Sequence, residues 1–335
     1  MSDKRKDLKK LDNYPDLMDA RCQTMKTYDG FSLRTALWPA TVPAPKGTIC
    51  LLQGRSEFIE KYYEVIQELR QKGFAVATFD WRGQGGSDRL LDDPLKGHVR
   101  RFADYGRDLD QFMKQIALPD TPRPHFALAH SMGGLILLSN LPHMRTLFER
   151  TLITTPLLEL ASQQRRFMGL RFQQQTIRKL AGCLRFLGRG KAYMLGADRK
   201  PIDPLGFEGN PLTSDGPRYD RNRRYLVDFP ELAIAGPTAS WLHESCKAMD
   251  HLQSSDVQAT IHTPTLIITA SQDTIVSTNM AEQFASSTRA AYAISIAGSR
   301  HEVMMERNIL RQQFWAAFDS FIPGSNPVEL TDVAS

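Results

Sequence analysis

The sequence lacks several features that would assign it to a specialised class of protein. No apolar run approaches the roughly 18 to 20 residues that a membrane-spanning helix needs. The four cysteines, Cys22, Cys50, Cys183 and Cys246, form no C-x-x-C pair and have no histidines at zinc spacing. Their scatter argues against a metal site and against a disulfide framework. We therefore expect a globular chain from a reducing cytoplasm.

A secretion signal is also absent from the start of the chain. The first residues, "MSDKRKDLKKLDNYPD", alternate basic and acidic side chains and contain no apolar core segment, so they do not read as a signal peptide. We predict a flexible, solvated tail over residues 1–20 and a cytoplasmic location. The net charge of +5 is modest for 335 residues and by itself indicates little about partners.

Strand and helix patterns alternate along much of the chain. An Asp29-Gly30 pair between two alternating segments indicates an antiparallel hairpin. The strands that follow are apolar throughout, as expected for a parallel sheet covered on both faces. The predicted strands are 47–54, 74–80, 124–130, 263–273 and 290–301, and the predicted helices are 61–72, 101–118 and 302–322.

This alternation stops between residues 156 and 245. Helical pieces rich in Gln, Arg and Phe and a long loop-like stretch occupy that segment, and we interpret it as a helical cap inserted over the sheet. The predicted fold is therefore α/β, with a mostly parallel sheet and helices on both faces. Its predicted parts are the tail 1–20, the core 21–155 and 246–323, the cap 156–245 and a C-terminal tail 324–335.

Three polar residues follow predicted strands. Ser131 comes after "FALAH", Asp273 after "TLIITASQ" and His301 after "AYAISIAGSR". Ligand sites of open α/β sheets lie at the carboxyl ends of the strands, so we expect these side chains to meet. Their chain order is that of the α/β-hydrolase triad. We predict Ser131 as the nucleophile, His301 as the base that accepts its proton, and Asp273 as the carboxylate that orients the imidazole.

The surroundings of Ser131 fit a sharp turn between strand and helix. Small residues two positions away on each side, Ala129 and Gly133, avoid clashes where strand and helix pass closely. An oxyanion hole would need the backbone amide of Met132, directly after the nucleophile, and a second amide from the loop "LLQGRSEF", for which we predict Arg55.

Several residues compete for these assignments. A five-residue serine motif alone is weak evidence, because a structural serine in a turn is the commoner reading. Asp250 and Asp256 compete for the role of the acid, but both precede their strand instead of following it. His130 is read as structural or as part of the pocket wall.

Longer motifs resemble a known family. "FDWRGQGGSDR", "QGRSEFIEKY", "GHVRRFADY", "ALAHSMGG" and "PELAIAGPTASWLHES" resemble segments of α/β-hydrolase serine hydrolases, in particular monoacylglycerol lipases and bacterial inner-membrane lysophospholipases. The resemblance covers roughly residues 25–320, with Gln53 replacing the family's usual histidine. It implies ester hydrolysis on a monoacyl lipid without metal or organic cofactor. The substrate-contacting residues that we predict are Gln53, Gly54, His130, Phe167 and Phe172.

The predicted cap is strongly basic. Between Glu159 and Arg224 fourteen Lys or Arg face six Asp or Glu, interleaved with Phe, Leu and Ile. One interpretation is an ordinary cap with solvated arginines; the other is a lid that touches an anionic membrane surface, at the inner membrane, or that accepts the lipid. No aromatic-interleaved motif or known module supports nucleic-acid binding, so we predict none.

Four functions remain in competition at this point. A lysophospholipase that works through an acyl-enzyme is the first hypothesis, and a monoacylglycerol lipase or general carboxylesterase is its nearest alternative. An aminopeptidase of the same fold would need an acidic pocket for the substrate ammonium. A ligand-binding relative without turnover would not need the complete set of Ser131, Asp273 and His301.

Overall fold

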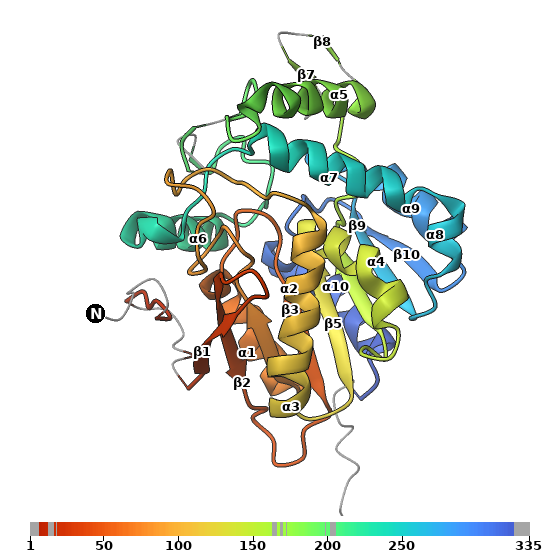
Figure 1. Cartoon of the computed structure of the whole chain (residues 1–335). Coiled ribbons are helices and arrows are strands. Elements are labelled where there is room, and N and C mark those ends of the chain that lie inside the picture. Colours follow the sequence, from red (N-terminus) through yellow and green to blue (C-terminus); the bar gives the residue numbers. More distant parts are fainter. Residues whose placement is uncertain are drawn as a thin grey trace, which may run out of the picture.

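An eight-stranded sheet forms the centre of the molecule (Figure 1). The computed structural model describes residues 7–12, 17, 19–162, 166–167, 170–171, 173–197, 199–201 and 206–324. The strand order is β1-β2-β4-β3-β5-β6-β9-β10, and β2 pairs antiparallel with β1 and β4 whereas all other neighbours pair in parallel. The strands of this sheet are β1 (Arg21–Lys26), β2 (Ser32–Trp38), β3 (Thr48–Leu52), β4 (Ala75–Phe79), β5 (His125–His130), β6 (Thr151–Thr154), β9 (Thr265–Ala270) and β10 (Ala291–Ile296).

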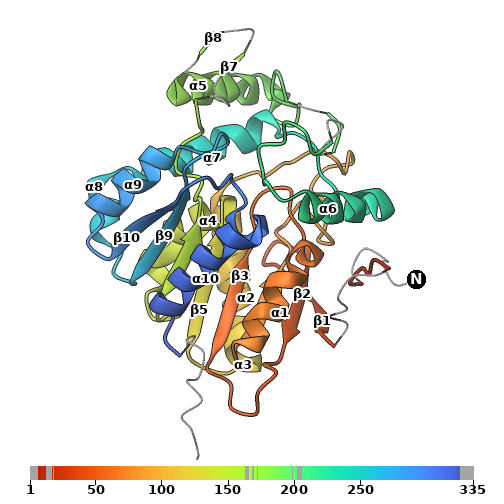
Figure 2. The same ribbon diagram turned by 180° about the vertical axis from the view of Figure 1, so that it is seen from behind.

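Helices cover both faces of the sheet (Figures 1 and 2). α1 and α10 pack on one face, α2, α4 and α9 pack on the other, and α7 crosses next to α4. The helices are α1 (Tyr63–Gln71), α2 (Ala103–Phe112), α3 (Leu118–Asp120), α4 (Met132–Met144), α5 (Gln174–Leu184), α6 (Gly216–Asp228), α7 (Ala239–Leu252), α8 (Ser255–Ala259), α9 (Thr278–Ser287) and α10 (Asn308–Phe321). Shorter turns are the 3₁₀ segments η2 (Ile59–Tyr62), η5 (Pro230–Leu232) and η6 (Val303–Met305), and the π-helical segments η3 (Met113–Ala117) and η4 (Arg185–Arg189).

The predicted α/β class is confirmed, and the burial pattern explains why the sequence indicated it. Every residue of β3, β4, β5 and β9 is buried, because helices lie on both sides of these strands. α1 is amphipathic, with Val65, Ile66 and Leu69 turned to the core. It ends before Gly73, whose φ of +93° is a conformation that glycine adopts without strain.

Two local predictions need correction. The strand β6 was not recognised in the sequence; it has only four residues, too few for a clear pattern. The hairpin between β1 and β2 does form, but its connection runs from Thr27 to Phe31 and is longer than a two-residue turn. The Thr27 amide donates to the Phe31 carbonyl at 2.8 Å, and Asp29 forms an ion pair with Arg82.

The predicted N-terminal tail is wrong in the part that the structure describes. Leu8, Leu11 and Leu17 are buried. The Lys9 amide donates to Glu60 Oε1 at 2.9 Å. Leu11 packs with Phe58, Tyr225 and Leu232. Leu8 and Leu17 join the large core cluster on the α1 and α10 face of the sheet. The charged residues around these leucines hid the pattern in the sequence. The predicted C-terminal tail lies outside the described residues except for Gly324.

The segment between β6 and β9 lies over the carboxyl ends of the strands (Figure 1). α5 packs along α7, and α6 lies above η2. A short antiparallel pair, β7 (Arg166–Phe167) and β8 (Leu170–Arg171), precedes α5. The predicted boundary at residue 245 falls inside α7, so this helix belongs to both the cap and the core. Within the described ranges, no helix combines the length and apolar character needed to cross a bilayer.

Candidate active site

Ser131 sits on a sharp turn between β5 and α4. Its φ of 49° and ψ of −113° lie in a region that non-glycine residues rarely adopt. The Ser131 amide donates to the Thr154 carbonyl at 3.0 Å, and its own carbonyl accepts from the Leu157 amide at 3.1 Å. A Cβ on Gly133 would lie 2.5 Å from the Leu52 carbonyl oxygen. Glycine is therefore required at position 133, because the end of β3 passes directly against the start of α4.

The structure brings the three predicted catalytic side chains together. His301 Nε2 lies 3.0 Å from Ser131 Oγ, and His301 Nδ1 lies 2.7 Å from Asp273 Oδ2. The other Asp273 oxygen accepts from the amides of Ile275 and Val276 at 2.8 and 3.0 Å. The carboxylate is thereby held with one oxygen aimed at the imidazole, which is the geometry that fixes a tautomer with its free lone pair toward the serine.

The charges around His301 suit it to act as a base. Burial by itself would lower the pKa of His301, but the Asp273 carboxylate and, less strongly, Glu302 and Glu57 raise it above its ordinary value. Burial would raise the pKa of Asp273, yet His301 and the two backbone amides outweigh this effect and keep the pKa low. The pair therefore favours an ionised Asp273 beside an imidazole that holds a proton readily.

The two amides predicted for the oxyanion hole belong to Met132 and Arg55. Met132 is the first residue of α4, so its N–H has no partner within the helix. Gly54 donates its N–H to the Glu57 carboxylate, which bends the loop after β3 and sets the direction of the following residue, Arg55. A Cβ on Gly54 would lie 2.8 Å from Glu57 Oε2 and 3.0 Å from the His130 ring. Arg55 borders the same cavity as Ser131.

A buried ionic cluster supports this loop, and sequence reasoning missed it. Lys61 Nζ donates to Glu57 Oε1 at 2.7 Å and to Glu302 Oε1 at 2.5 Å. Tyr62 donates its hydroxyl to Glu57 at 2.6 Å. Burial would raise the pKa of Glu57, but Lys61 and the adjacent groups lower it to about 2, so this carboxylate stays ionised. The spacing of Glu57 and Lys61, four residues apart, was the available signal.

His130 lies within this cluster and next to His301. Its ring centroid is 4.9 Å from that of His301, and its Nδ1 is 3.0 Å from Thr154 Oγ1. Burial lowers the pKa of His130 to about 3, with Glu57 opposing and His301 adding to the effect. A neutral His130 adds no positive charge beside the base, which is consistent with a place in the pocket wall.

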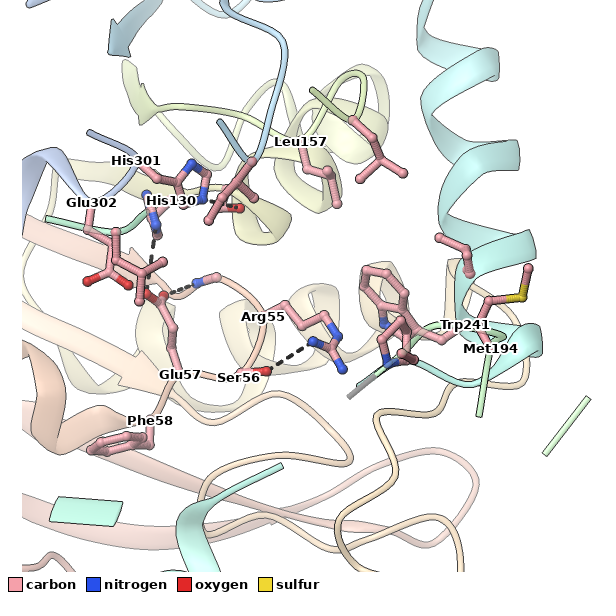
Figure 3. Close-up of a pocket in the computed structure, with 18 of the residues that line it drawn as sticks. Arg55, Ser56, Glu57, Phe58, His130, Leu157, Met194, Trp241, His301 and Glu302 are labelled. Carbon is pink, nitrogen blue, oxygen red and sulfur yellow. Dashed lines mark hydrogen bonds and ion pairs between the residues drawn. The ribbon is translucent and has the colours of Figure 1, made fainter. Parts of the chain in front are cut away.

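The site opens into a cavity of about 610 Å³, which has a mainly apolar wall (Figure 3). Two of the predicted substrate contacts, Gly54 and His130, line it. Gln53 does not: it is fully buried, and its side-chain amide lies beside Asp80 and the Ile59 amide, because it points into the packing under η2. Phe172 and the Phe167 side chain lie outside the described residues. Apolar lining residues include Leu157, Leu160, Ile177, Leu180, Met194, Leu195, Trp241, Leu242 and Ile275.

Metal chemistry has no evident site in the described part of the chain, where no group of three His, Cys, Asp or Glu is arranged to hold an ion. The fold and the arrangement of Ser131, His301 and Asp273 define a serine hydrolase of the α/β-hydrolase class. Within this class, residues 43–308 match the family described as "Serine aminopeptidase, S33", and the chain belongs to that family.

The names of several similar proteins refer to the hydrolysis of lipids. "Lysophospholipase L2" of Escherichia coli K12 is 33% identical over 270 residues, which are 78% of this chain and 76% of that protein. "Probable lysophospholipase L2" of Haemophilus influenzae is 26% identical over 83% of this chain and 84% of its own length. A soluble variant of monoglyceride lipase from Saccharomyces cerevisiae shares the fold with a TM-score of 0.71 and 18% identity, covering 92% of this chain and 97% of that one.

Proposed function

We propose that the protein hydrolyses the acyl ester of monoacyl lipids and is a lysophospholipase. The observation that carries this proposal is a serine, histidine and aspartate in hydrogen-bonding order at the base of a large cavity with an apolar wall. An apolar wall of this kind can accept one acyl chain, and the volume of the cavity is within the range of small-molecule sites. The similarity to the lysophospholipase from Escherichia coli supports the same substrate class.

In the proposed mechanism Ser131 Oγ attacks the acyl carbonyl carbon while His301 Nε2 takes the hydroxyl proton. The carbonyl oxygen, now negative, accepts hydrogen bonds from the amides of Met132 and Arg55. The carbon–oxygen bond to glycerol then breaks, and His301 gives its proton to the departing oxygen. Water, deprotonated by the same histidine, then attacks the acyl carbon. The bond from this carbon to Ser131 Oγ breaks as His301 returns the proton to Oγ, and the fatty acid leaves.

The family description makes an aminopeptidase the second candidate. An aminopeptidase needs a free carboxylate to bind the substrate ammonium. Among the described lining residues the acids are Glu57 and Glu302, and both are bonded to Lys61. The cavity therefore favours an uncharged or anionic substrate over a cationic one.

Comparing fatty-acid release from lysophosphatidylcholine, lysophosphatidylethanolamine and monoacylglycerol tests this function. We expect a higher kcat/KM for the two lysophospholipids than for monoacylglycerol with the same acyl chain. A proline p-nitroanilide serves as the peptidase substrate and is expected to show no turnover. Preference for monoacylglycerol, or turnover of short soluble esters alone, would replace the proposal by a monoacylglycerol lipase or a general carboxylesterase. Turnover of the anilide would favour the aminopeptidase.

We also propose that residues 156–245 form a cap that touches an anionic membrane surface. At its outer end Phe186 and Leu187 are 90% and 66% exposed, and Arg189 and Lys191 beside them are exposed too. Apolar side chains flanked by cations are typical of segments that lie in the membrane interface. Leu195 is exposed and also lines the cavity, so an apolar path leads from this surface toward Ser131.

Co-sedimentation with vesicles tests this contact. Replacing both residues, Phe186→Ser with Leu187→Ser, is expected to weaken binding to phosphatidylglycerol vesicles at least tenfold, because burying each side chain is worth about 1.5 to 3 kcal/mol. Ile309→Ser is the matched control, since Ile309 on α10 is also 66% exposed. Equal sedimentation of the double variant and the wild type would contradict the proposed contact.

A further inference from the structure

The side chain of Arg55 is partly buried and pairs with no carboxylate of the described residues. The four buried arginines in the described part of the chain all pair with carboxylates: Arg34 with Glu60 and Asp80, Arg70 with Asp19, Arg82 with Asp29 and Asp108, and Arg311 with Glu64 and Glu68. No ion pair of the described residues includes Arg55. A cation without a counter-charge is costly to bury. Stability alone therefore does not account for an arginine at position 55.

Neutral groups hold the Arg55 guanidinium in place. Nη2 donates to the Ala235 carbonyl at 2.5 Å, Nη1 donates to Ser56 Oγ at 3.1 Å, and the group lies 5.1 Å from the centre of a Trp241 ring (Figure 3). A Cβ on Gly97 would lie 2.3 Å from Nη2, so the chain leaves room for the guanidinium at this position. The orientation of the charge is thus fixed before any ligand binds.

Three of the five N–H groups of Arg55 make no hydrogen bond within the described residues, and the Nε–H is one of them. The side chain lines the cavity that contains Ser131 and His301. Burial lowers the pKa of Arg55 to about 10, against the opposing influence of Tyr105 and Tyr193, so the group remains charged near neutral pH. An arginine in this state can supply charge-assisted hydrogen bonds to an anion in the cavity.

Other charges in the cavity do not neutralise Arg55. The lining carboxylates Glu57 and Glu302 are both bonded to Lys61. Arg223, which also lines the cavity, adds a second positive charge from α6. The chemistry of the cavity therefore matches a substrate with an apolar chain and one anionic group.

We propose that the Arg55 guanidinium binds the phosphate of a lysophospholipid and so selects this substrate over neutral monoacylglycerols. This inference rests on the proposed function, in which the Arg55 amide faces the scissile carbonyl. The glycerol unit between the ester and the phosphate is about as long as an arginine side chain. One residue can therefore serve the carbonyl with its backbone and reach toward the phosphate with its side chain.

The test compares substrates within each variant. Arg55→Met keeps the length and apolar part of the side chain and removes the charge. The kcat/KM for lysophosphatidylcholine, divided by that for a monoacylglycerol with the same acyl chain in the same mixed micelles, is expected to fall tenfold or more, as for the loss of a hydrogen bond between charged groups. This ratio does not depend on the folded fraction of the sample. Any disturbance of the Arg55 amide lowers kcat/KM for both substrates together and so leaves the ratio unchanged.

Two further arms make the result specific. Arg289→Met removes an exposed charge in the link between α9 and β10 and is expected to leave the ratio unchanged. Lysophosphatidic acid has the phosphate without choline. The kcat/KM of Arg55→Met for this substrate is expected to fall as it does for lysophosphatidylcholine. Inorganic phosphate is expected to inhibit the wild type more strongly than Arg55→Met, since only the wild type holds the anion site.

The outcomes separate the inference from the function on which it rests. An unchanged ratio in Arg55→Met, or a loss confined to lysophosphatidylcholine, overturns the role of Arg55. The proposed function still stands in that case if the wild type prefers lysophospholipids. A wild type that prefers monoacylglycerol overturns both. A reduced ratio for both phosphate-containing substrates supports the phosphate site.

Discussion

The variant Ser131→Ala is expected to lose nearly all turnover while folding normally. Removing the nucleophile of a complete triad costs on the order of 10⁶ in kcat. The fold should be retained, because the only hydrogen bond of Ser131 Oγ in the described structure is to His301, and alanine meets the same backbone strain at a φ of 49°. Fatty-acid release from lysophosphatidylcholine measures the loss, and thermal unfolding measures the fold.

A fluorophosphonate probe provides an independent check of Ser131. The wild type is expected to be labelled and Ser131→Ala to remain unlabelled at the same protein concentration. Equal ester hydrolysis by the two proteins would show that another residue is the nucleophile. A wild type that binds lipid but neither turns it over nor reacts with the probe would indicate a ligand-binding relative of the fold.

The variant Asp273→Asn is expected to lower kcat by about 10⁴, the usual effect of this change in a triad. The asparagine oxygen can still accept from the amides of Ile275 and Val276. Its NH₂ group then faces His301 Nδ1 and favours the tautomer whose Nε2 carries the hydrogen, which cannot accept the proton of Ser131. Asp256→Asn is the control, because Asp256 is exposed on α8, and it is expected to retain full activity.

The pH profile of Asp273→Asn distinguishes this role from a structural one. In the wild type Asp273 raises the pKa of His301 above its ordinary value of 6.5, despite burial. A protonated imidazole cannot act as base, so kcat/KM falls as the pH drops through that raised pKa. Without the Asp273 carboxylate the pKa of His301 is lower than in the wild type, because only Glu302 and Glu57 then oppose the effect of burial. The acid limb of the residual activity is expected to move to lower pH; an unmoved limb would contradict the assignment.

Elements with a strong local signal were predictable from the sequence. The apolar runs of β3, β5 and β9 and the glycine after α1 have physical causes that act within a few residues. The positions of Ser131, Asp273 and His301 at strand ends were predictable for the same reason, since each follows such a run. That they lie within hydrogen-bonding distance is a property of the sheet order, which only the structure shows.

Long-range pairing explains what the sequence did not reveal. Lys61 and Glu302 are 241 residues apart, and neither position looks unusual in its own segment. The backbone of Arg55 could be assigned to the oxyanion loop from its place after β3, but the direction of its side chain depends on Ala235 and Trp241, 180 or more residues away. Gln53 was misassigned because the side chains of neighbouring loop residues point to opposite sides.

The contacts between the cap and the loop of His301 limit how freely this insertion can be exchanged. The Glu302 amide donates to the Leu212 carbonyl at 2.7 Å, and Arg300 Nη1 donates to the carbonyls of Asn210 and Thr213 at 2.9 and 3.0 Å. Ser214 in turn bonds to the Glu306 carboxylate. A chimera that takes residues 206–228 from a relative with a different backbone course, and keeps residues 300–306, would leave these groups without partners beside His301. The cap therefore cannot be exchanged alone to change the substrate range. Recombination or directed evolution of the cap has to include residues 300–306 as well.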